Sequence, residues 1–261
     1  RRVCVLIQFS LYKQMVMVTS LFLFNFASGW SGTALYDSWI LTGFNTFYTF
    51  LPPIVYGFME QDVPAEAMQQ YPQLYEAGSR GDGFNSLTLL LWMANGFLHC
   101  LLAFLLPTAA FAAAGASDLG VYGTCIMNVL AIACNVRIFL AQCQVTKVSH
   151  VAISISVFSF YIWALILGDV WTSFGIFPSY YGEALASFGN PVLWLAVLVT
   201  FVLMSALDVS FLYAHRTLCP NPTYVVQEIV HGFRPPESLE SEGSVRGRQN
   251  EFAPLVAPAN K

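Results

Sequence analysis

Charged residues are scarce in this chain of 261 residues: they make up 10% of it, whereas a soluble domain carries about 25%. So few charges cannot cover a water-facing surface, and the composition therefore excludes a soluble enzyme. A hydrophobic fraction of 56% also excludes a disordered chain. The 11 basic residues are dispersed along the sequence, which argues against binding of nucleic acid. The class that fits is an integral membrane protein.

Motifs for catalysis are also missing. The sequence has no G-x-x-x-x-G-K-[ST] loop, no G-x-S-x-G nucleophile elbow and no H-E-x-x-H zinc motif. The six cysteines form no C-x-x-C pair and four lie in apolar runs, which indicates membrane-buried thiols rather than disulfides or metal ligands. We therefore expect neither a catalytic site nor a metal site in this chain.

What the sequence does contain is long apolar stretches. A membrane-spanning helix needs about 20 mostly apolar residues, and six stretches qualify: 3–26, 35–58, 87–106, 119–140, 151–170 and 191–213. Their apolar character is continuous rather than alternating, which favours helices over barrel strands. No internal repeat is visible, so nothing supports an inverted-repeat transporter. We predict an all-α integral membrane fold with six transmembrane helices.

The basic residues indicate how these spans are oriented. They stand before the first span, in alternate connections and after the last span: Arg1, Arg2, Arg80, Lys147 and Arg216. The other connections, residues 27–34, 107–118 and 171–190, contain no lysine or arginine. By the positive-inside rule, both termini and the basic loops are predicted to be cytoplasmic.

The spans divide the chain into four regions. Residues 1–58 hold the first two helices, 59–86 form a cytoplasmic loop and 87–214 form a four-helix support region. Residues 215–261 contain Pro pairs and a Glu/Ser/Arg stretch, which predicts a largely disordered cytoplasmic tail with room for a short helix at 223–231. Because the chain begins at Arg1 without a targeting segment, we expect it to be part of a longer protein.

Polar residues inside the spans carry the functional signal, because a lysine at the centre of a bilayer costs about 2.5–3.5 kcal/mol on insertion scales. Lys13 lies near the middle of the first span, beside Gln14, and must face a partner, a polar cavity or water. One interpretation is that these residues line a transport path. The alternative is that they form hydrogen bonds that hold helices together.

The second span carries a polar stripe. Four side chains follow the spacing i, i+3, i+4, i+7 of one helical face: Thr42, Asn45, Thr46 and Thr49. The stripe runs into Pro52 and Pro53, whose missing N–H groups are predicted to kink or unwind the helix and to free backbone carbonyls. This combination favours a path for a polar group. The alternative is that the threonines bond their own helix and pack tightly.

Three other polar residues have simpler interpretations. Arg137, near the inner end of the fourth span, can extend to the membrane surface. Asp208 in the sixth span is expected to pair with a cation or a helix end. His99 is expected to be a hydrogen-bonded packing residue, because no second histidine or cysteine stands at metal-ligand spacing.

Short motifs follow one another in a fixed order along the chain. They include Tyr12-Lys13-Gln14, Gly29-Trp30-Ser31-Gly32-Thr33, Thr49-Phe50-Leu51-Pro52-Pro53, Glu60-Gln61-Asp62, Tyr71-Pro72-Gln73-Leu74-Tyr75 and Gln227-Glu228. The series resembles the type IV P-type ATPases, the phospholipid flippases, which usually have Tyr-Lys-Asn and G-[FW]-S-G-Q at the first two positions. Any single match is weak, but the ordered series is specific and extends to about residue 230.

The resemblance implies that the six spans are the fifth to tenth helices of a ten-helix domain. It implies an enzyme that couples ATP hydrolysis to moving phospholipid from the outer to the cytoplasmic leaflet, usually with a two-span accessory glycoprotein. ATP and Mg²⁺ would be bound by domains upstream of this chain. Lys13 matches a membrane lysine that the family associates with lipid movement and dephosphorylation, and Asn45 and Pro52-Pro53 belong to a helix bordering its lipid groove.

We therefore predict the carboxyl-terminal membrane part of a multi-pass flippase of the plasma membrane or of an endomembrane such as the Golgi or endosome. Its substrate-binding residues would be Lys13, Gln14, Thr42, Asn45, Thr46 and Thr49, with Pro52, Pro53 and Asp208 in structural roles. The alternatives are a self-contained six-helix channel or scramblase and a structural membrane scaffold. Neither accounts for the ordered motifs.

Overall fold

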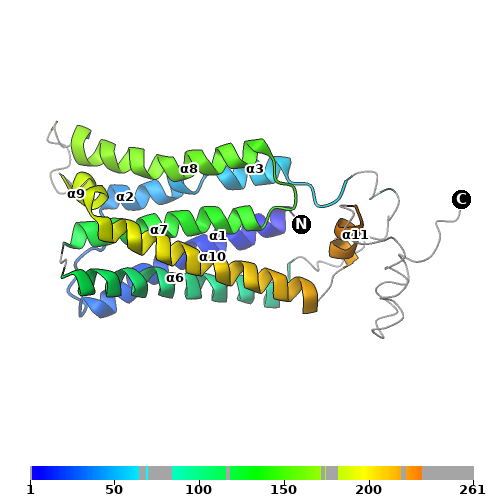
Figure 1. Ribbon diagram of the computed structural model, residues 1–261, viewed down its shortest axis with the longest axis horizontal. Helices are drawn as coiled ribbons and strands as arrows, with labels where there is room; N and C mark the ends of the chain where they lie inside the picture. Colours follow the sequence, from blue (N-terminus) through cyan, green and yellow to red (C-terminus); the bar gives the residue numbers. More distant parts are fainter. Residues whose placement is uncertain are drawn as a thin grey trace, which may run out of the picture.

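Five long helices form the body of the protein in the computed structural model, which describes residues 2–64, 69, 84–115, 118–171, 174, 182–218 and 222–230. They are α1 (Arg2–Ala27), α6 (Ser86–Ala114), α7 (Leu119–Leu140), α8 (Lys147–Leu165) and α10 (Pro191–Leu218). Each is long and apolar enough to cross a membrane. Within the described ranges every regular element is helical, so the prediction of an all-α membrane fold is confirmed. The long helices lie roughly side by side (Figure 1).

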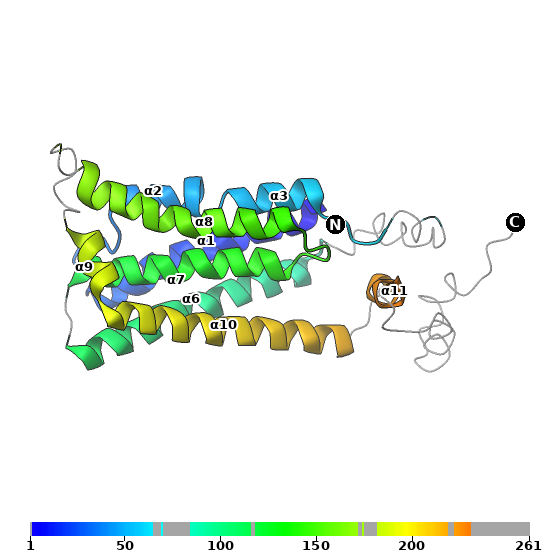
Figure 2. The same cartoon turned by 45° about the horizontal axis from the view of Figure 1, so that its top comes forward.

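The second predicted span is broken into three pieces. They are α2 (Ser38–Gly43), the π-helix η1 (Phe44–Tyr48) and α3 (Leu51–Met59). The pieces lie end to end along α8, and together they run the length of the bundle (Figures 1 and 2). No one of them is long enough to cross a membrane, so six crossings and a cytoplasmic location of both termini stay predictions.

Local signals in the sequence set where several helices begin. Asn85 and Thr88 form a capping box at the start of α6, in which the Asn85 side chain accepts from the Thr88 amide at 2.8 Å. Asp118 caps α7 and Thr146 caps α8 in the same way, with a side-chain oxygen accepting a backbone N–H. The helix α6 continues to Ala114, eight residues beyond the predicted span, because an alanine-rich run favours helix.

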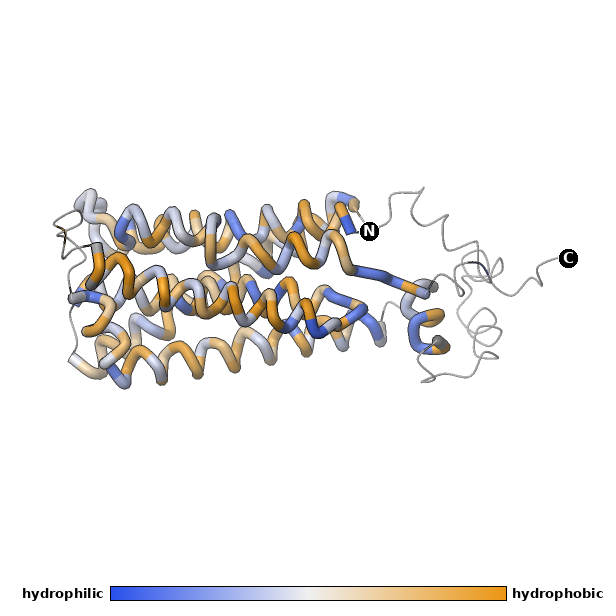
Figure 3. Tube along the Cα trace, turned by 90° about the horizontal axis from the view of Figure 1, so that it is seen from above, coloured by the Kyte–Doolittle hydropathy of each residue, from blue (hydrophilic) through white to orange (hydrophobic). Residues whose placement is uncertain are grey.

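The helix α7 is the centre of the bundle. Of its most apolar window 72% is buried, against 28–33% for the other four long helices. A helix that is covered on all sides must be apolar on all sides or satisfy its polar groups internally. Apolar residues dominate along the bundle, and hydrophilic residues gather towards the end that bears α11 (Figure 3). The polar groups that α7 does contain are therefore held inside the protein.

Shorter elements close the two ends of the bundle. The π-helix η2 (Ile166–Trp171) extends α8, and α9 (Glu183–Gly189) precedes α10. At the opposite end, α11 (Pro222–Val230) lies where the sequence allowed a short helix. The rest of the predicted disordered tail and most of the predicted loop 59–86 lie outside the described residues.

Candidate functional site

Two of the predicted substrate-binding residues, Gln14 and Asn45, meet between α1 and η1. Gln14 Nε2 donates to Asn45 Oδ1 at 3.3 Å, and both side chains are exposed. Lys13 is half-buried, and it makes no hydrogen bond or ion pair with any residue that the structure describes. Lys13 precedes Gln14 in the sequence, and a half-buried ammonium and exposed amides are groups that can bind an anion or another polar group.

The π-helix η1 alters the predicted threonine stripe. Thr42 and Thr46 remain exposed, but Thr49 is buried, because the wider turn of a π-helix shifts the residues that follow it. Each threonine hydroxyl donates to a carbonyl of its own segment. The acceptors are Ser38 at 2.8 Å for Thr42, Thr42 at 3.1 Å for Thr46 and Phe44 at 2.6 Å for Thr49. The structure therefore brings Thr42 and Thr46 to the surface and leaves Thr49 inside.

Pro52 and Pro53 lie in the first turn of α3, where a missing N–H is least costly. In an unbroken helix the carbonyl of Tyr48 would accept from the N–H of residue 52, which proline lacks. In the structure this carbonyl accepts instead from Asn135 Nδ2 of α7, at 2.8 Å, and Asn135 is fully buried. A side chain from the central helix thus satisfies a backbone group that the prolines free.

A network of buried polar groups lies between α6, α7 and α10. Asp208 Oδ1 accepts from Arg137 Nη1 at 3.0 Å and from Asn95 Nδ2 at 2.8 Å, and it lies 3.5 Å from His99 Nε2. The prediction that Asp208 pairs with a cation is confirmed by its ion pair with Arg137. The prediction that His99 is a hydrogen-bonded packing residue is confirmed because its Nδ1 bonds the Tyr12 hydroxyl at 2.7 Å. A cavity of about 10 Å³ borders His99 and Asp208, and none of the six predicted substrate-binding residues lines it.

The prediction for Arg137 is wrong. Its side chain is 13% exposed and turns into the bundle, with the guanidinium 4.3 Å above the Trp92 ring. A lone arginine would extend to the membrane surface, but the carboxylate of Asp208, 71 residues away in sequence, holds it inside.

Comparisons with known proteins bear on what this arrangement serves. The family model described as phospholipid-translocating P-type ATPase C-terminal matches residues 1–221. The chain belongs to this family. It is 31% identical over 238 residues to phospholipid-transporting ATPase C887.12 of Schizosaccharomyces pombe and 30% identical over 241 residues to phospholipid-transporting ATPase DRS2 of Saccharomyces cerevisiae. Each alignment covers 88% of this chain, and the chain spans only 19% and 17% of those relatives.

A plant member of the flippase family is also similar to most of this chain. Probable phospholipid-transporting ATPase 4 of Arabidopsis thaliana is 32% identical over 239 residues, which cover 88% of this chain and 19% of that protein. Relatives from yeasts and a plant thus share one family over nearly the whole chain. This agrees with the resemblance carried by the ordered motifs.

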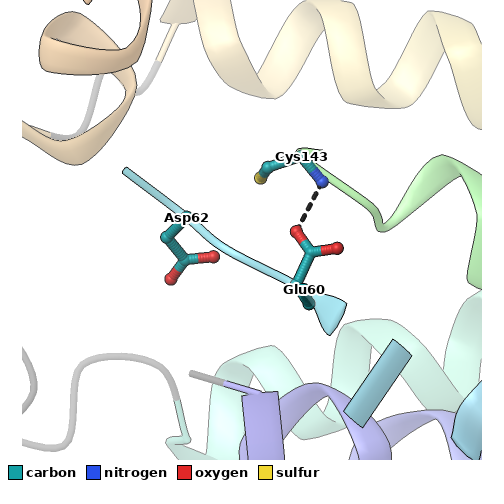
Figure 4. Close-up of side chains that lie close together, drawn as sticks. All are labelled: Glu60, Asp62 and Cys143. Atoms are coloured by element: carbon teal, nitrogen blue, oxygen red, sulfur yellow. Dashed lines mark hydrogen bonds between the residues drawn. The ribbon is translucent and has the colours of Figure 1, made fainter. Parts of the chain in front are cut away.

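Three side chains of types that can bind a metal ion lie near α11. Donor atoms of Glu60, Asp62 and Cys143 are all within 4.8 Å of one another. Figure 4 shows that Glu60 accepts from the backbone N–H of Cys143, at 2.6 Å. Gln227 of α11 donates to the Asp62 carbonyl at 2.8 Å, and its amide lies 3.4 Å from Cys143 Sγ. These contacts tie α11 to the end of α3 and to the α7–α8 turn, which is a structural role.

Sequence reasoning assigned no role to Asn135 or to Asn95. Both are amides inside apolar spans, where an amide without a partner is costly. The cost of burying an amide is the signal that could have marked both residues as hydrogen-bonded inside the protein. It does not identify the partner, because the Tyr48 carbonyl lies 87 residues from Asn135 in the sequence.

Proposed function

We propose that this chain supplies the last six transmembrane helices of an ATP-driven flippase, with both termini in the cytoplasm, which moves phospholipid from the outer to the cytoplasmic leaflet. Membership of the family and the names of the relatives, which are phospholipid-transporting ATPases, support this function. ATP and Mg²⁺ would be bound by domains upstream of residue 1. A two-span accessory glycoprotein and a location in the plasma membrane or an endomembrane belong to the same proposal.

The observation that carries the role of this chain is the half-buried ammonium of Lys13, which makes no hydrogen bond or ion pair with the described residues and is next in sequence to Gln14 of the Gln14–Asn45 hydrogen bond. Every phospholipid headgroup contains a phosphate, and an ammonium is a good partner for phosphate oxygens. The amide pair is exposed and its 3.3 Å hydrogen bond is long, so either amide can exchange this bond for one to a headgroup. We assign Lys13, Gln14 and Asn45 to headgroup binding.

Thr42 and Thr46 complete the proposed surface in a different way. Their hydroxyl hydrogens are used within the helix, but each oxygen keeps a lone pair that can accept from a headgroup or from water. Thr49 is buried, so we assign it to the stability of η1 rather than to lipid. Polar contacts along this path would lower the cost of moving a headgroup past hydrocarbon, while the acyl chains stay in the bilayer.

The test is Lys13→Ala in the full-length protein, reconstituted in vesicles, with lipid uptake and lipid-stimulated ATPase as readouts. Because a charge-assisted hydrogen bond contributes about 1.5–3 kcal/mol, we expect kcat/KM for lipid to fall at least about tenfold. The matched control is Lys147→Ala, which removes an exposed lysine at the start of α8 and should leave both readouts unchanged.

Two outcomes would contradict the proposal. Unchanged lipid uptake and ATPase in Lys13→Ala would reject the headgroup role of this residue. Lipid movement by residues 1–261 alone, in vesicles without ATP, would instead favour the channel or scramblase alternative.

A further inference from the structure

A continuous series of polar contacts leads from the interior of the bundle to the residue next to Lys13. It begins at Asp208 on α10, passes through His99 on α6 and ends at the hydroxyl of Tyr12 on α1. We propose that Tyr12, His99 and Asp208 form a positioning relay that fixes the part of α1 carrying Lys13. This inference rests on the proposed function, because it assumes that the position of Lys13 matters for lipid.

The contacts have the polarity that such a relay needs. The Asp208 carboxylate lies 3.5 Å from His99 Nε2, where the geometry makes no hydrogen bond, and its negative charge favours the histidine tautomer with the proton on Nε2. Its Nδ1 is then an acceptor for the Tyr12 hydroxyl at 2.7 Å. All three side chains are at most 3% exposed, so bulk water does not compete for the bond between Tyr12 and His99.

The inner end of the relay is itself fixed. Asn95 and Arg137 both donate to the Asp208 oxygen that faces His99, and the Arg137 guanidinium is stacked over Trp92. The carboxylate is therefore held by three helices and cannot follow a movement of α1. A carboxylate fixed 3.5 Å from Nε2 keeps the imidazole in one tautomer by its charge, and that tautomer leaves Nδ1 free to accept from Tyr12.

The ring of Tyr12 is held as closely as its hydroxyl. Trp92 contacts it edge-on with ring centroids 6.3 Å apart. A Cβ at Gly96 would lie 3.1 Å from Tyr12 Cδ2, so the absence of a side chain there lets α6 approach α1. Because Lys13 is the next residue on the same helix, fixing Tyr12 restricts the rotation and the depth of the lysine.

The relay predicts a specific kinetic effect. If α1 samples several positions, only a fraction of molecules presents Lys13 correctly, and the apparent affinity for lipid falls by that fraction. Loss of one hydrogen bond of about 1 kcal/mol corresponds to about a fivefold change. The defect should appear in KM for lipid, while the maximal ATPase rate stays within about twofold of the wild type.

The experiment uses full-length protein with Tyr12→Phe, which keeps the packed ring and removes only the hydroxyl. We expect the lipid concentration for half-maximal ATPase to rise about fivefold. The matched control is Tyr161→Phe, which removes a hydroxyl that donates to Asn128 at 3.2 Å in a contact between α8 and α7 that does not involve α1; it should leave KM unchanged.

Histidine variants test the connection. His99→Leu removes the contacts of His99 with Tyr12 and with Asp208. Adding Tyr12→Phe to it should cause no further rise in KM, because Tyr12 and His99 act through one contact. His99→Asn keeps an acceptor near the position of Nδ1 and should recover part of the affinity. It also serves as the test variant if His99→Leu fails to fold.

Results that would overturn the relay are equally specific. A normal KM in Tyr12→Phe, or effects of Tyr12→Phe and His99→Leu that multiply, would show that these residues only pack. With Lys13→Ala defective, such a result rejects the relay and leaves the proposed function standing. A normal Lys13→Ala protein rejects the proposed function itself.

Discussion

The α1–η1 junction and the α6–α7–α10 interior treat their polar groups in opposite ways. In the interior, Asp208 has two hydrogen-bond donors and lies against a third group, and Arg137 is paired and stacked. Lys13 makes no hydrogen bond or ion pair with the described part of the chain, and at the junction Gln14 and Asn45 share one long hydrogen bond at the surface. Polar side chains thus bond mainly to each other inside the bundle, whereas those at the junction are open to the surface.

This difference separates support from function. Buried polar groups that satisfy each other fix the relative positions of helices. Polar groups that are left open inside a membrane span are costly, and they persist where they meet a substrate or water. The comparison therefore predicts that substitutions in the interior reduce stability, whereas substitutions at the junction reduce lipid-dependent activity at little cost in stability.

Asp208→Ala tests the interior and should have the largest effect. It leaves the Arg137 guanidinium inside the bundle without its carboxylate, and breaking a buried pair of this kind costs about 3–5 kcal/mol. We expect a clear fall in the midpoint of thermal unfolding of the full-length protein, measured in detergent. The control is Asn45→Ala at the junction, which should change stability by less than about 0.5 kcal/mol because the side chain is exposed. Equal losses in the two variants would remove the distinction between the regions.

Asn135→Leu tests how the broken helix is held, and its effect should be smaller. The substitution leaves the Tyr48 carbonyl without the amide of α7, and a buried acceptor that loses its donor costs about 1–3 kcal/mol. Pro52→Ala restores an N–H at the position from which an unbroken helix would serve this carbonyl. Added to Asn135→Leu, it should recover part of the lost stability in the same unfolding assay. If Pro52→Ala gave no recovery, the carbonyl would not be the group that Asn135 protects.

How far the sequence predicts this structure depends on the distance over which each interaction acts. Apolar runs predict the five long helices, because helix formation and burial are decided within a single segment. The prolines predict a break in the second span, also locally. They do not predict η1 or the role of Asn135, because the freed carbonyl could have been satisfied by any nearby helix. Arg137 was misplaced for the same reason, since its partner Asp208 is brought near only by the fold.

The candidate site shows the same limit: positions within one segment can be predicted from spacing, and contacts between segments cannot. The spacing of Thr42, Asn45 and Thr46 predicts a common face, and all three are exposed. Thr49 lies beyond the π-turn and is buried, which a regular helical period cannot anticipate. The meeting of Gln14 with Asn45 required the packing of α1 against the broken segment, which no spacing within either segment encodes.

Glu183 on α9 extends the comparison to the opposite end of the bundle from α11, with the smallest expected effect. Its carboxylate is packed so closely against α7 that a Cβ at Gly120 would collide with it. Burial, and then the charges of Asp118 and Asp37, raise the pKa of Glu183 above its ordinary value of 4.5. The folded protein therefore holds this proton more tightly than the unfolded chain. Stability should be greatest below that ordinary value and should fall as the pH rises through the raised one.

Glu183→Gln removes the charge and should abolish this part of the pH dependence. We expect the variant to be more stable than the wild type at pH 7, by less than about 1 kcal/mol because the group is partly exposed, and to match it near pH 4. The measurement is the difference in unfolding midpoint between the two full-length proteins across that range, which cancels the titration of all other groups. A variant that was instead less stable at pH 7 would contradict this. It would mean that the dipole at the amino-terminal end of α7 stabilises the Glu183 carboxylate by more than burial and the two aspartates destabilise it.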